Sequence, residues 1–147
     1  MPETLRNQLG IAIARKAYET YRTLLDSPRW QRIQIAGARP ERLLWASTGT
    51  KDPKASNILY VQALALPSTI NTMPEATLNA LAAHREFGEA QPENNDRIFT
   101  EFAIAGVDTE AVATQLVEEG IASFAKSWND LLDCIASKSE ALKAAVA

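Results

Sequence analysis

Two short apolar runs in the first half of the chain each pass directly into polar residues. The first, residues 42–46, leads into Ser-Thr-Gly-Thr-Lys at residues 47–51, and the second, residues 69–72, leads into Met-Pro-Glu. Between them, residues 57–66 carry apolar side chains at helical spacing. The pattern predicts a strand, a loop, a helix and a second strand, which together form one βαβ unit with parallel strands. The first strand is apolar without alternation, which is typical of a strand covered on both faces.

Helical spacing dominates the rest of the first 86 residues. Residues 3–26 predict one long helix, because apolar residues recur three or four apart along one face: Leu5, Leu9, Ala12, Ile13, Ala17, Tyr21 and Leu24. Ser27, which precedes a proline, predicts the N-cap of a short helix that ends at Gly37. Thr72 and Glu75 have the spacing of a capping box and predict the start of another helix.

The strand signal disappears after residue 86. Helices are predicted at residues 96–105 and 108–119, ended by Gly106 and Gly120, and a last helix runs from residue 121 to the end of the sequence. The apolar positions of this last helix are expected to face a core: Phe124, Trp128, Leu131, Leu132, Ile135 and Leu142. Two strands among so many helices cannot close a barrel, and both would keep unpaired edges.

Composition and charge narrow the class of protein. The chain has 147 residues, of which 46% are hydrophobic and 22% charged, and these values suit one globular domain. Its net charge of −3 and its scattered Lys and Arg residues give no electrostatic footprint for nucleic acid. The single cysteine, Cys134, offers no internal disulfide and no metal-ligand spacing, so we expect a cytoplasmic protein without a metal or another cofactor. We expect no membrane partner, because no apolar run reaches membrane-spanning length and the first residues lack a signal-peptide pattern.

The two strand ends carry the candidate chemistry of the chain. Ser47 offers a hydroxyl donor and Lys51 a cation just after a strand, a combination that suits a bound anion such as phosphate. The alternative is a simple polar turn in which Gly49 supplies the backbone freedom. Three more polar residues stand where they could line the same pocket or simply stiffen the turns: Thr48, Thr50 and Asn71.

Other reactive side chains are expected to have structural roles. We expect the other lysines on solvated surfaces: Lys16, Lys54, Lys126, Lys138 and Lys143. His84 is expected on a helix surface and Cys134 in an apolar core. The tryptophans are expected to anchor packing rather than to hold a ligand: Trp30, Trp45 and Trp128. Because two strands leave a barrel incomplete, we also expect Leu44, Trp45 and part of the first helix's apolar face to be exposed.

The two strand segments resemble those of a known family. Residues 43–53 (LLWASTGTKDP) and residues 69–77 (TINTMPEAT) look like the last two barrel strands of bacterial transaldolases, and most like the longer subfamily that includes fusions with phosphoglucose isomerase. Further similar segments extend the likeness over nearly the whole chain: residues 9–18, 30–42 and 115–120, with Phe124 and Trp128. The resemblance implies an α/β fold, namely the helix-rich C-terminal fragment of a (β/α)8 TIM barrel with its last two parallel strands.

The resemblance also implies roles for residues of this chain. Transaldolases move a dihydroxyacetone unit between sugar phosphates in the pentose phosphate pathway, through a Schiff base on a lysine of the fourth strand. In this likeness Ser47 is the serine at the end of the seventh strand that contacts the substrate phosphate. Many relatives carry a cation two residues beyond it, where this chain has Gly49, so Lys51 is the nearest candidate for that cation.

The resemblance places this chain, residues 1–147, in the C-terminal part of one barrel domain. Residues 1–86 would form the end of the barrel and residues 87–147 a helical cap. The family's catalytic lysine and acid–base carboxylates would precede this segment, so we expect barrel closure and phosphate contacts from the chain but no catalysis by it alone. A separate N-terminal half, or self-association through strand edges, would then be its partner. The alternative is a non-catalytic helical binding or assembly module derived from a truncated transaldolase.

Overall fold

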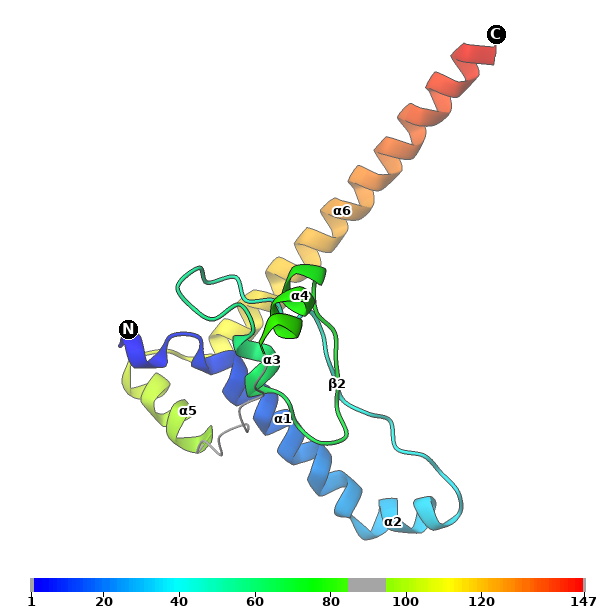
Figure 1. Cartoon of the computed structure of the whole chain (residues 1–147). Coiled ribbons are helices and arrows are strands. Elements are labelled where there is room, and N and C mark those ends of the chain that lie inside the picture. The colour runs from blue at the N-terminus through cyan, green and yellow to red at the C-terminus, as the bar shows by residue number, and fades with distance from the viewer. Residues whose placement is uncertain (1, 85–94, 147) are drawn as a thin grey trace. The chain divides into compact units, whose positions relative to one another are not determined.

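The computed structural model describes residues 2–84 and 95–146 (Figure 1). The chain divides into two compact units, Met1–Glu101 and Phe102–Ala147. The boundary predicted between barrel and cap, after residue 86, lies outside the described residues. That domain boundary therefore stays a prediction.

A left-handed residue interrupts the first predicted helix. A short 3-10 turn, η1 (Glu3–Leu5), is followed by Asn7 with a φ of +63°, and α1 (Gln8–Asp26) begins only after it. A left-handed residue cannot continue a right-handed helix. The single helix predicted for residues 3–26 is therefore broken near its start.

The second helix follows its predicted capping pattern. α2 (Pro28–Ile35) begins after Ser27, whose side-chain oxygen accepts a hydrogen bond from the backbone N–H of Trp30 at 3.2 Å. Gly37 follows the helix with a φ of +99°, a conformation that glycine adopts without a Cβ clash. Both predicted ends are confirmed.

The predicted βαβ unit is present in the first unit. β1 (Leu44–Trp45) and β2 (Ile70–Asn71) pair in parallel, with Leu44 opposite Ile70, and α3 (Leu59–Ala63) lies between them in the sequence. These are the two strands found among the described residues. Each strand is two residues long, so the regular pairing is shorter than the apolar runs that predicted it.

The core of the first unit joins α1, β1 and the end of α3. Ile11, Trp45 and Leu64 contact one another and are all buried. The expectation that Trp45 is exposed is wrong: it is 8% exposed, because the helices cover its face of the strand. Leu44 points to the other face and is 51% exposed, as expected.

The predicted apolar stripe of the first helix is only partly buried: Leu5 and Ala12 are buried as expected. Ile11 and Arg15 are buried, whereas Ile13 and Leu24 are mostly exposed. Arg15 donates from Nη2 to the carbonyl of Ala63 at 3.2 Å, so it meets a backbone acceptor at the end of α3. The exposure of Ile13 and Leu24 agrees with the expectation that part of this face is exposed, whereas the burial of Arg15, assigned to the polar side, was not predicted.

The helix after β2 begins without its predicted cap. The N-cap residue of α4 (Glu75–Ala83) is Pro74, and no side chain caps the helix. The prediction of Thr72 as its cap is wrong, because that hydroxyl is used between the two strand ends. α5 (Asn95–Ile104) agrees with the helix predicted at residues 96–105 to within one residue.

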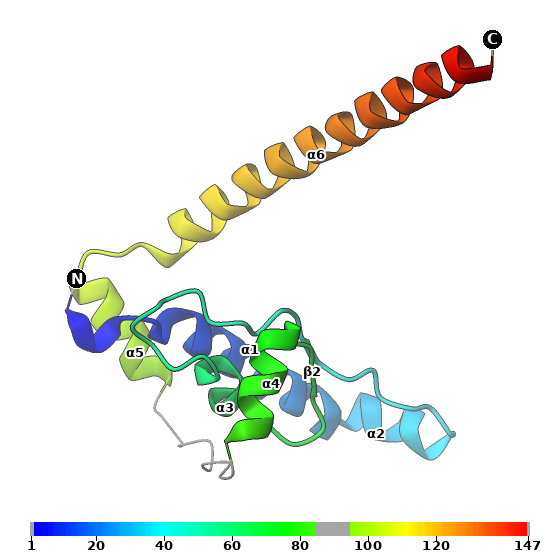
Figure 2. The same cartoon turned by 45° about the horizontal axis from the view of Figure 1, so that its top comes forward.

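The second unit is dominated by one long helix, α6 (Thr109–Val146), which Figure 2 shows as continuous. Its start is as predicted, because the carboxylate of Asp108 accepts hydrogen bonds from the backbone N–H groups of residues 110 and 111. The predicted break at Gly120 is absent, since a glycine inside a helix costs only about 1 kcal/mol.

The apolar side chains of α6 are exposed rather than packed in a core. Phe124 is 82% exposed and Trp128 is 60% exposed, and the other positions predicted to face inward are exposed as well: Leu131, Leu132, Ile135 and Leu142. Cys134 is also exposed, so its predicted burial is wrong. A single helix cannot bury its own apolar face.

Candidate functional site

The polar residues that follow β1 and β2 meet at one end of the strand pair, because parallel strands end at the same edge of a sheet. The backbone N–H of Ser47 donates to Thr72 Oγ1 at 3.1 Å, and the N–H of Thr48 donates to the Thr72 carbonyl at 3.1 Å. The Thr72 hydroxyl in turn donates to the carbonyl of Trp45 at 3.2 Å. Thr72 therefore fixes the point at which the chain leaves β1.

Thr48 and Asn71 bond to each other. The Thr48 hydroxyl lies 2.6 Å from Asn71 Oδ1 and 3.1 Å from the Thr72 carbonyl, and the Thr48 residue is buried. Both side chains were candidates for lining a pocket. In the structure, their hydrogen bond links the ends of the two strands. That either side chain contacts a ligand stays a prediction.

Ser47 and Lys51 present their polar groups to solvent. Ser47 is exposed and has a φ of +55°, a left-handed conformation that costs a serine about 1 kcal/mol. Among the described residues, neither the Ser47 hydroxyl nor the Lys51 ammonium has a hydrogen-bond or ion-pair partner. Strained backbone conformations of this kind cluster at functional sites.

The loop between these residues runs against the start of α4. A Cβ placed on Gly49 would lie 2.9 Å from Pro74 Cγ, so only glycine fits this close approach. The same Cβ would lie 3.6 Å from Thr77 Oγ1 in the first turn of α4. Thr50, the third candidate for lining a pocket, has a buried hydroxyl with no partner among the described residues.

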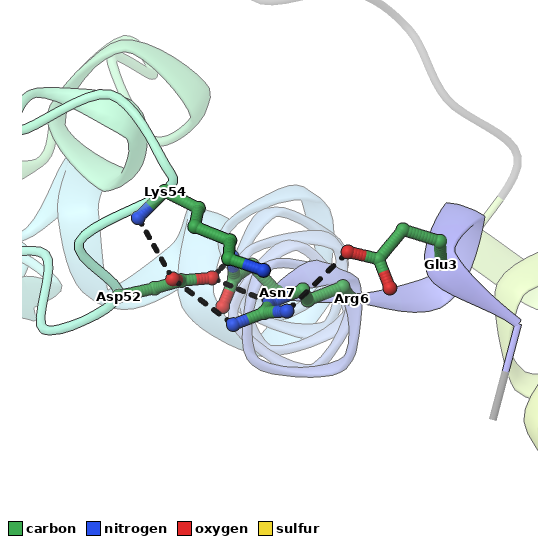
Figure 3. Close-up of polar contacts among 5 residues, drawn as sticks. All are labelled: Glu3, Arg6, Asn7, Asp52 and Lys54. Atoms are coloured by element: carbon green, nitrogen blue, oxygen red, sulfur yellow. Dashed lines mark hydrogen bonds and ion pairs between the residues drawn. The ribbon is translucent and has the colours of Figure 1, made fainter.

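Asp52 anchors the far end of the loop to the beginning of the chain (Figure 3). Its carboxylate accepts from Arg6 Nε at 2.6 Å, from Arg6 Nη2 at 3.1 Å and from the Asn7 side-chain amide at 2.8 Å. It also accepts from the backbone N–H of Lys54 at 3.0 Å, which closes a local turn. Glu3 extends the cluster through a second contact with Arg6 at 3.3 Å.

These hydrogen bonds stabilise the ionised carboxylate. They lower the pKa of Asp52 from its usual 3.8 to about 2, with the Asn7 amide as the largest cause, followed by the Lys54 N–H and the Arg6 guanidinium. The pKa of Arg6 is raised in return, chiefly by its hydrogen bond to Asp52 and by the charge of that residue. The cluster thus holds a full ion pair, which is a structural anchor rather than a proton donor.

The other residues considered for chemistry are solvated. All lysines of the chain are exposed: Lys16, Lys51, Lys54, Lys126, Lys138 and Lys143. His84, which directly follows α4, is exposed and its Nδ1 lies 2.7 Å from the carbonyl of Ala80 in that helix. Over the described ranges, no three His, Cys, Asp or Glu side chains gather as ligands for a metal ion.

A hollow of about 510 Å³ lies at the opposite end of β1 from Ser47. Its walls come from the end of α1, from Trp30 of α2 and from residues 40–44, which precede and enter the strand. It is mainly apolar and shares no residue with the loop that follows β1. The hollow is therefore separate from the candidate site.

The sequence identified the site residues that follow β1, but not the contacts with other segments that hold this loop in place. Ser47 and Lys51 were singled out because they follow a strand, whereas Thr72 was assigned to a helix cap. Asp52 was not singled out as a candidate. The Asp-Pro pair does signal the turn at Lys54, but nothing local signals the contacts with Arg6 and Asn7, which lie about 45 residues away.

Comparisons with known proteins place this chain in a family. The sequence model of the transaldolase/fructose-6-phosphate aldolase family matches residues 2–135. A transaldolase of Parafrankia sp. is 47% identical over 137 residues, which are 90% of this chain and 37% of that protein. Transaldolases of Frankia alni and Mycolicibacterium smegmatis are 44% and 41% identical, over 92% and 95% of this chain and 38% of each relative. The resemblance suggested by the two strand motifs is confirmed.

The chain spans a little over a third of the length of the curated relatives that it matches. The family fold is a TIM barrel, and the two parallel strands of this chain with their helices are consistent with part of one. No helix within residues 2–84 and 95–146 has both the length and the apolar character needed to cross a membrane.

Proposed function

Because this chain belongs to the transaldolase family, we propose that it forms the C-terminal part of a transaldolase barrel and holds the phosphate of a sugar-phosphate substrate. In this proposal Ser47 donates its hydroxyl to the phosphate and Lys51 supplies the positive charge. Thr48, Thr50 and Asn71 shape the surrounding loop. The observation that carries the proposal is the free Ser47 hydroxyl, held in a left-handed conformation just after β1.

The surroundings of the loop favour an anion. Gly49 brings the backbone against Pro74, so the loop lies at the N-terminal end of α4, where unpaired backbone N–H groups carry a partial positive charge. A hydroxyl, an ammonium and a helix start together supply the donors that phosphate sites use. TIM barrels often bind phosphate after their last two strands, next to a short helix.

The same proposal assigns the covalent chemistry to residues outside this segment. A Schiff base needs a lysine whose amine is desolvated and deprotonated at neutral pH. Every lysine of this chain is exposed, so none has that environment. The chain would then act with a further transaldolase segment, either in the same polypeptide or as a separate chain, that supplies the catalytic lysine and the acid–base carboxylates.

The proposal is tested by titrating the chain with fructose 6-phosphate while recording its amide NMR spectrum. We expect shifts at residues 47–51, and we expect Ser47→Ala to weaken binding about tenfold or more, because a hydrogen bond to a charged group is lost. Ser68→Ala is the matched control, since Ser68 is also exposed and left-handed, with a φ of +61°. Its affinity should equal that of the wild type.

Unphosphorylated fructose serves as the ligand control and should leave the spectrum unchanged. Lys51→Met should weaken binding and reduce its dependence on salt, because one charge contact with the phosphate is removed. If fructose 6-phosphate shifts no amide in residues 47–51, the proposed function is wrong.

A second candidate function rests on α6. Its exposed apolar side chains, Phe124 and Trp128 among them, form the kind of surface that a partner helix or another copy of the chain would cover. A non-catalytic binding or assembly module would use this helix and would have no affinity for a sugar phosphate. The titration therefore separates the two candidates, since only the first expects shifts at the loop after β1.

A further inference from the structure

The loop that carries the proposed phosphate contacts is fixed at both ends. At its beginning, Ser47 and Thr48 bond to Thr72 at the end of β2. At its other end, Asp52 bonds to Arg6 and Asn7 just before α1. Lys51 stands directly before the second anchor.

We propose that Asp52 is a positioning residue that holds Lys51 in place for the substrate phosphate, by tying the end of the loop to Arg6 and Asn7. The inference rests on the proposed function, because it assigns Asp52 a role in the same phosphate site. To that site it adds Asp52, a residue that does not contact the ligand. It also adds a structural connection between the first turn of the chain and the loop after β1.

The geometry of the carboxylate suits this role. Both oxygens of Asp52 are occupied, one by Arg6 Nε and Asn7 Nδ2 and the other by Arg6 Nη2 and the Lys54 N–H. Its side chain is only 10% exposed, although the loop lies on the surface. A carboxylate held by a two-pronged guanidinium contact and an amide cannot rotate without breaking several bonds at once. The backbone of Lys51, the residue before Asp52, is therefore held in place.

Charge alone would give Asp52 the opposite role. A carboxylate next to a phosphate-binding lysine repels the phosphate, and its removal should tighten anion binding. Arg6 offsets this repulsion by neutralising the carboxylate with a hydrogen-bonded ion pair. The two explanations therefore predict effects of opposite sign when the charge is removed.

Asn7 provides an independent connection to the same anchor. It is left-handed, with a φ of +63°, and its side-chain amide donates to Asp52 at 2.8 Å. Replacing Asn7 by glycine keeps that backbone conformation accessible and removes only the amide. The change leaves the net charge unaltered, so it acts on position and not on the electrostatic attraction.

The test measures the dissociation constant of inorganic phosphate by NMR titration of the whole chain, together with the backbone amide order of residues 50–54. We expect Asp52→Asn to weaken phosphate binding roughly five- to tenfold, although it removes a negative charge, and to increase the motion of the Lys51 amide. Asn7→Gly should weaken binding in the same direction. Circular dichroism and thermal melting identify any variant that fails to fold.

Asp96→Asn is the matched control, because Asp96 also pairs with a cation of the α1 region, Lys16, at 3.4 Å. It removes the same charge without touching the loop and should leave the phosphate affinity within about twofold of the wild type. If Asp52→Asn and Asn7→Gly bind phosphate as tightly as the wild type or more tightly, the positioning role is overturned while the phosphate site stands. If the wild type binds no phosphate, the proposed function fails and the inference fails with it.

Discussion

At the scale of single residues, the Asp52 carboxylate accepts four hydrogen bonds from three residues. Its ionised form accepts hydrogen bonds from Arg6, Asn7 and the Lys54 N–H, whereas a protonated carboxyl would lose the ion pair. The folded chain therefore binds the proton of Asp52 less tightly than the unfolded chain does, with a pKa of about 2 instead of 3.8. Such a group adds stability above the unfolded pKa, and that stability is lost as the pH falls through the folded pKa.

We therefore expect the stability difference between the wild type and Asp52→Asn to depend on pH. The wild type should be the more stable protein at pH 6, and its advantage should shrink as the pH falls from about 4 to about 2. Urea unfolding of both proteins at matched pH values measures the difference. Asp96→Asn reports the background from an exposed aspartate. An advantage that is constant over this range would show that the ionised carboxylate does not contribute to the fold.

The role of a residue could be predicted where the neighbouring sequence indicates it. Ser47 and Lys51 follow an apolar run, and that position alone suggested an anion site. Asp52 meets Arg6 and Asn7 because the segment before α1 lies next to the loop in the folded chain. The spacing of hydrophobic residues along the sequence does not predict that contact. The burial of Trp45 was missed for a similar reason, because its cover comes from Ile11 in α1 and Leu64 at the end of α3, both distant in the sequence.

At the scale of elements, the position of the loop after β1 depends on a close contact with α4. An added methyl group on Gly49 would meet the ring of Pro74 at 2.9 Å from Cγ and 3.2 Å from Cδ. A proline ring cannot rotate out of the way as a flexible side chain could. The loop or the start of α4 must then move to accommodate it.

We therefore expect Gly49→Ala to destabilise the protein by about 1–3 kcal/mol, as overpacking usually does. Gly10→Ala is the matched control, because a Cβ on Gly10 meets nothing within 4 Å and the residue lies within α1. This variant should be more stable than the wild type by about 0.5–1 kcal/mol, since alanine favours a helix. Urea unfolding of both variants measures the two effects. Equal stability of Gly49→Ala and the wild type would contradict the close contact.

The types of the elements were more predictable than their limits. The order strand, helix, strand, helix is as expected, because apolar runs and helical spacing carry it along the sequence. The residue at which an element begins or ends depends on which of several possible hydrogen bonds or backbone conformations the boundary residue adopts. Thr72 bonds across the strand ends instead of capping α4, and Asn7 turns left-handed and shortens α1. Gly120 remains inside α6, where nothing else interrupts the helix.

At the scale of the whole molecule, each of the two units carries exposed apolar side chains. Leu44 on the strand and Phe124 and Trp128 on α6 are all mostly exposed. The helical spacing of the last 27 residues correctly predicted a helix with an apolar face but placed that face in a core. Spacing predicts that a face needs a partner, and it does not specify whether the partner lies in the same segment. The exposed faces fit the proposal that this chain is one part of a larger barrel.

The same proposal predicts that this chain alone forms no Schiff base. Lysines in solvent remain protonated at neutral pH, and the pKa of Lys16 is raised further, mainly by the charge of Asp96. We therefore expect the intact mass to be unchanged after incubation with fructose 6-phosphate and sodium borohydride, which would reduce and trap any imine. Full-length transaldolase of Mycolicibacterium smegmatis, 41% identical to this chain, is the positive control and should gain the mass of a reduced three-carbon unit. The same gain on any lysine of this chain would place the covalent chemistry within it and overturn the proposal.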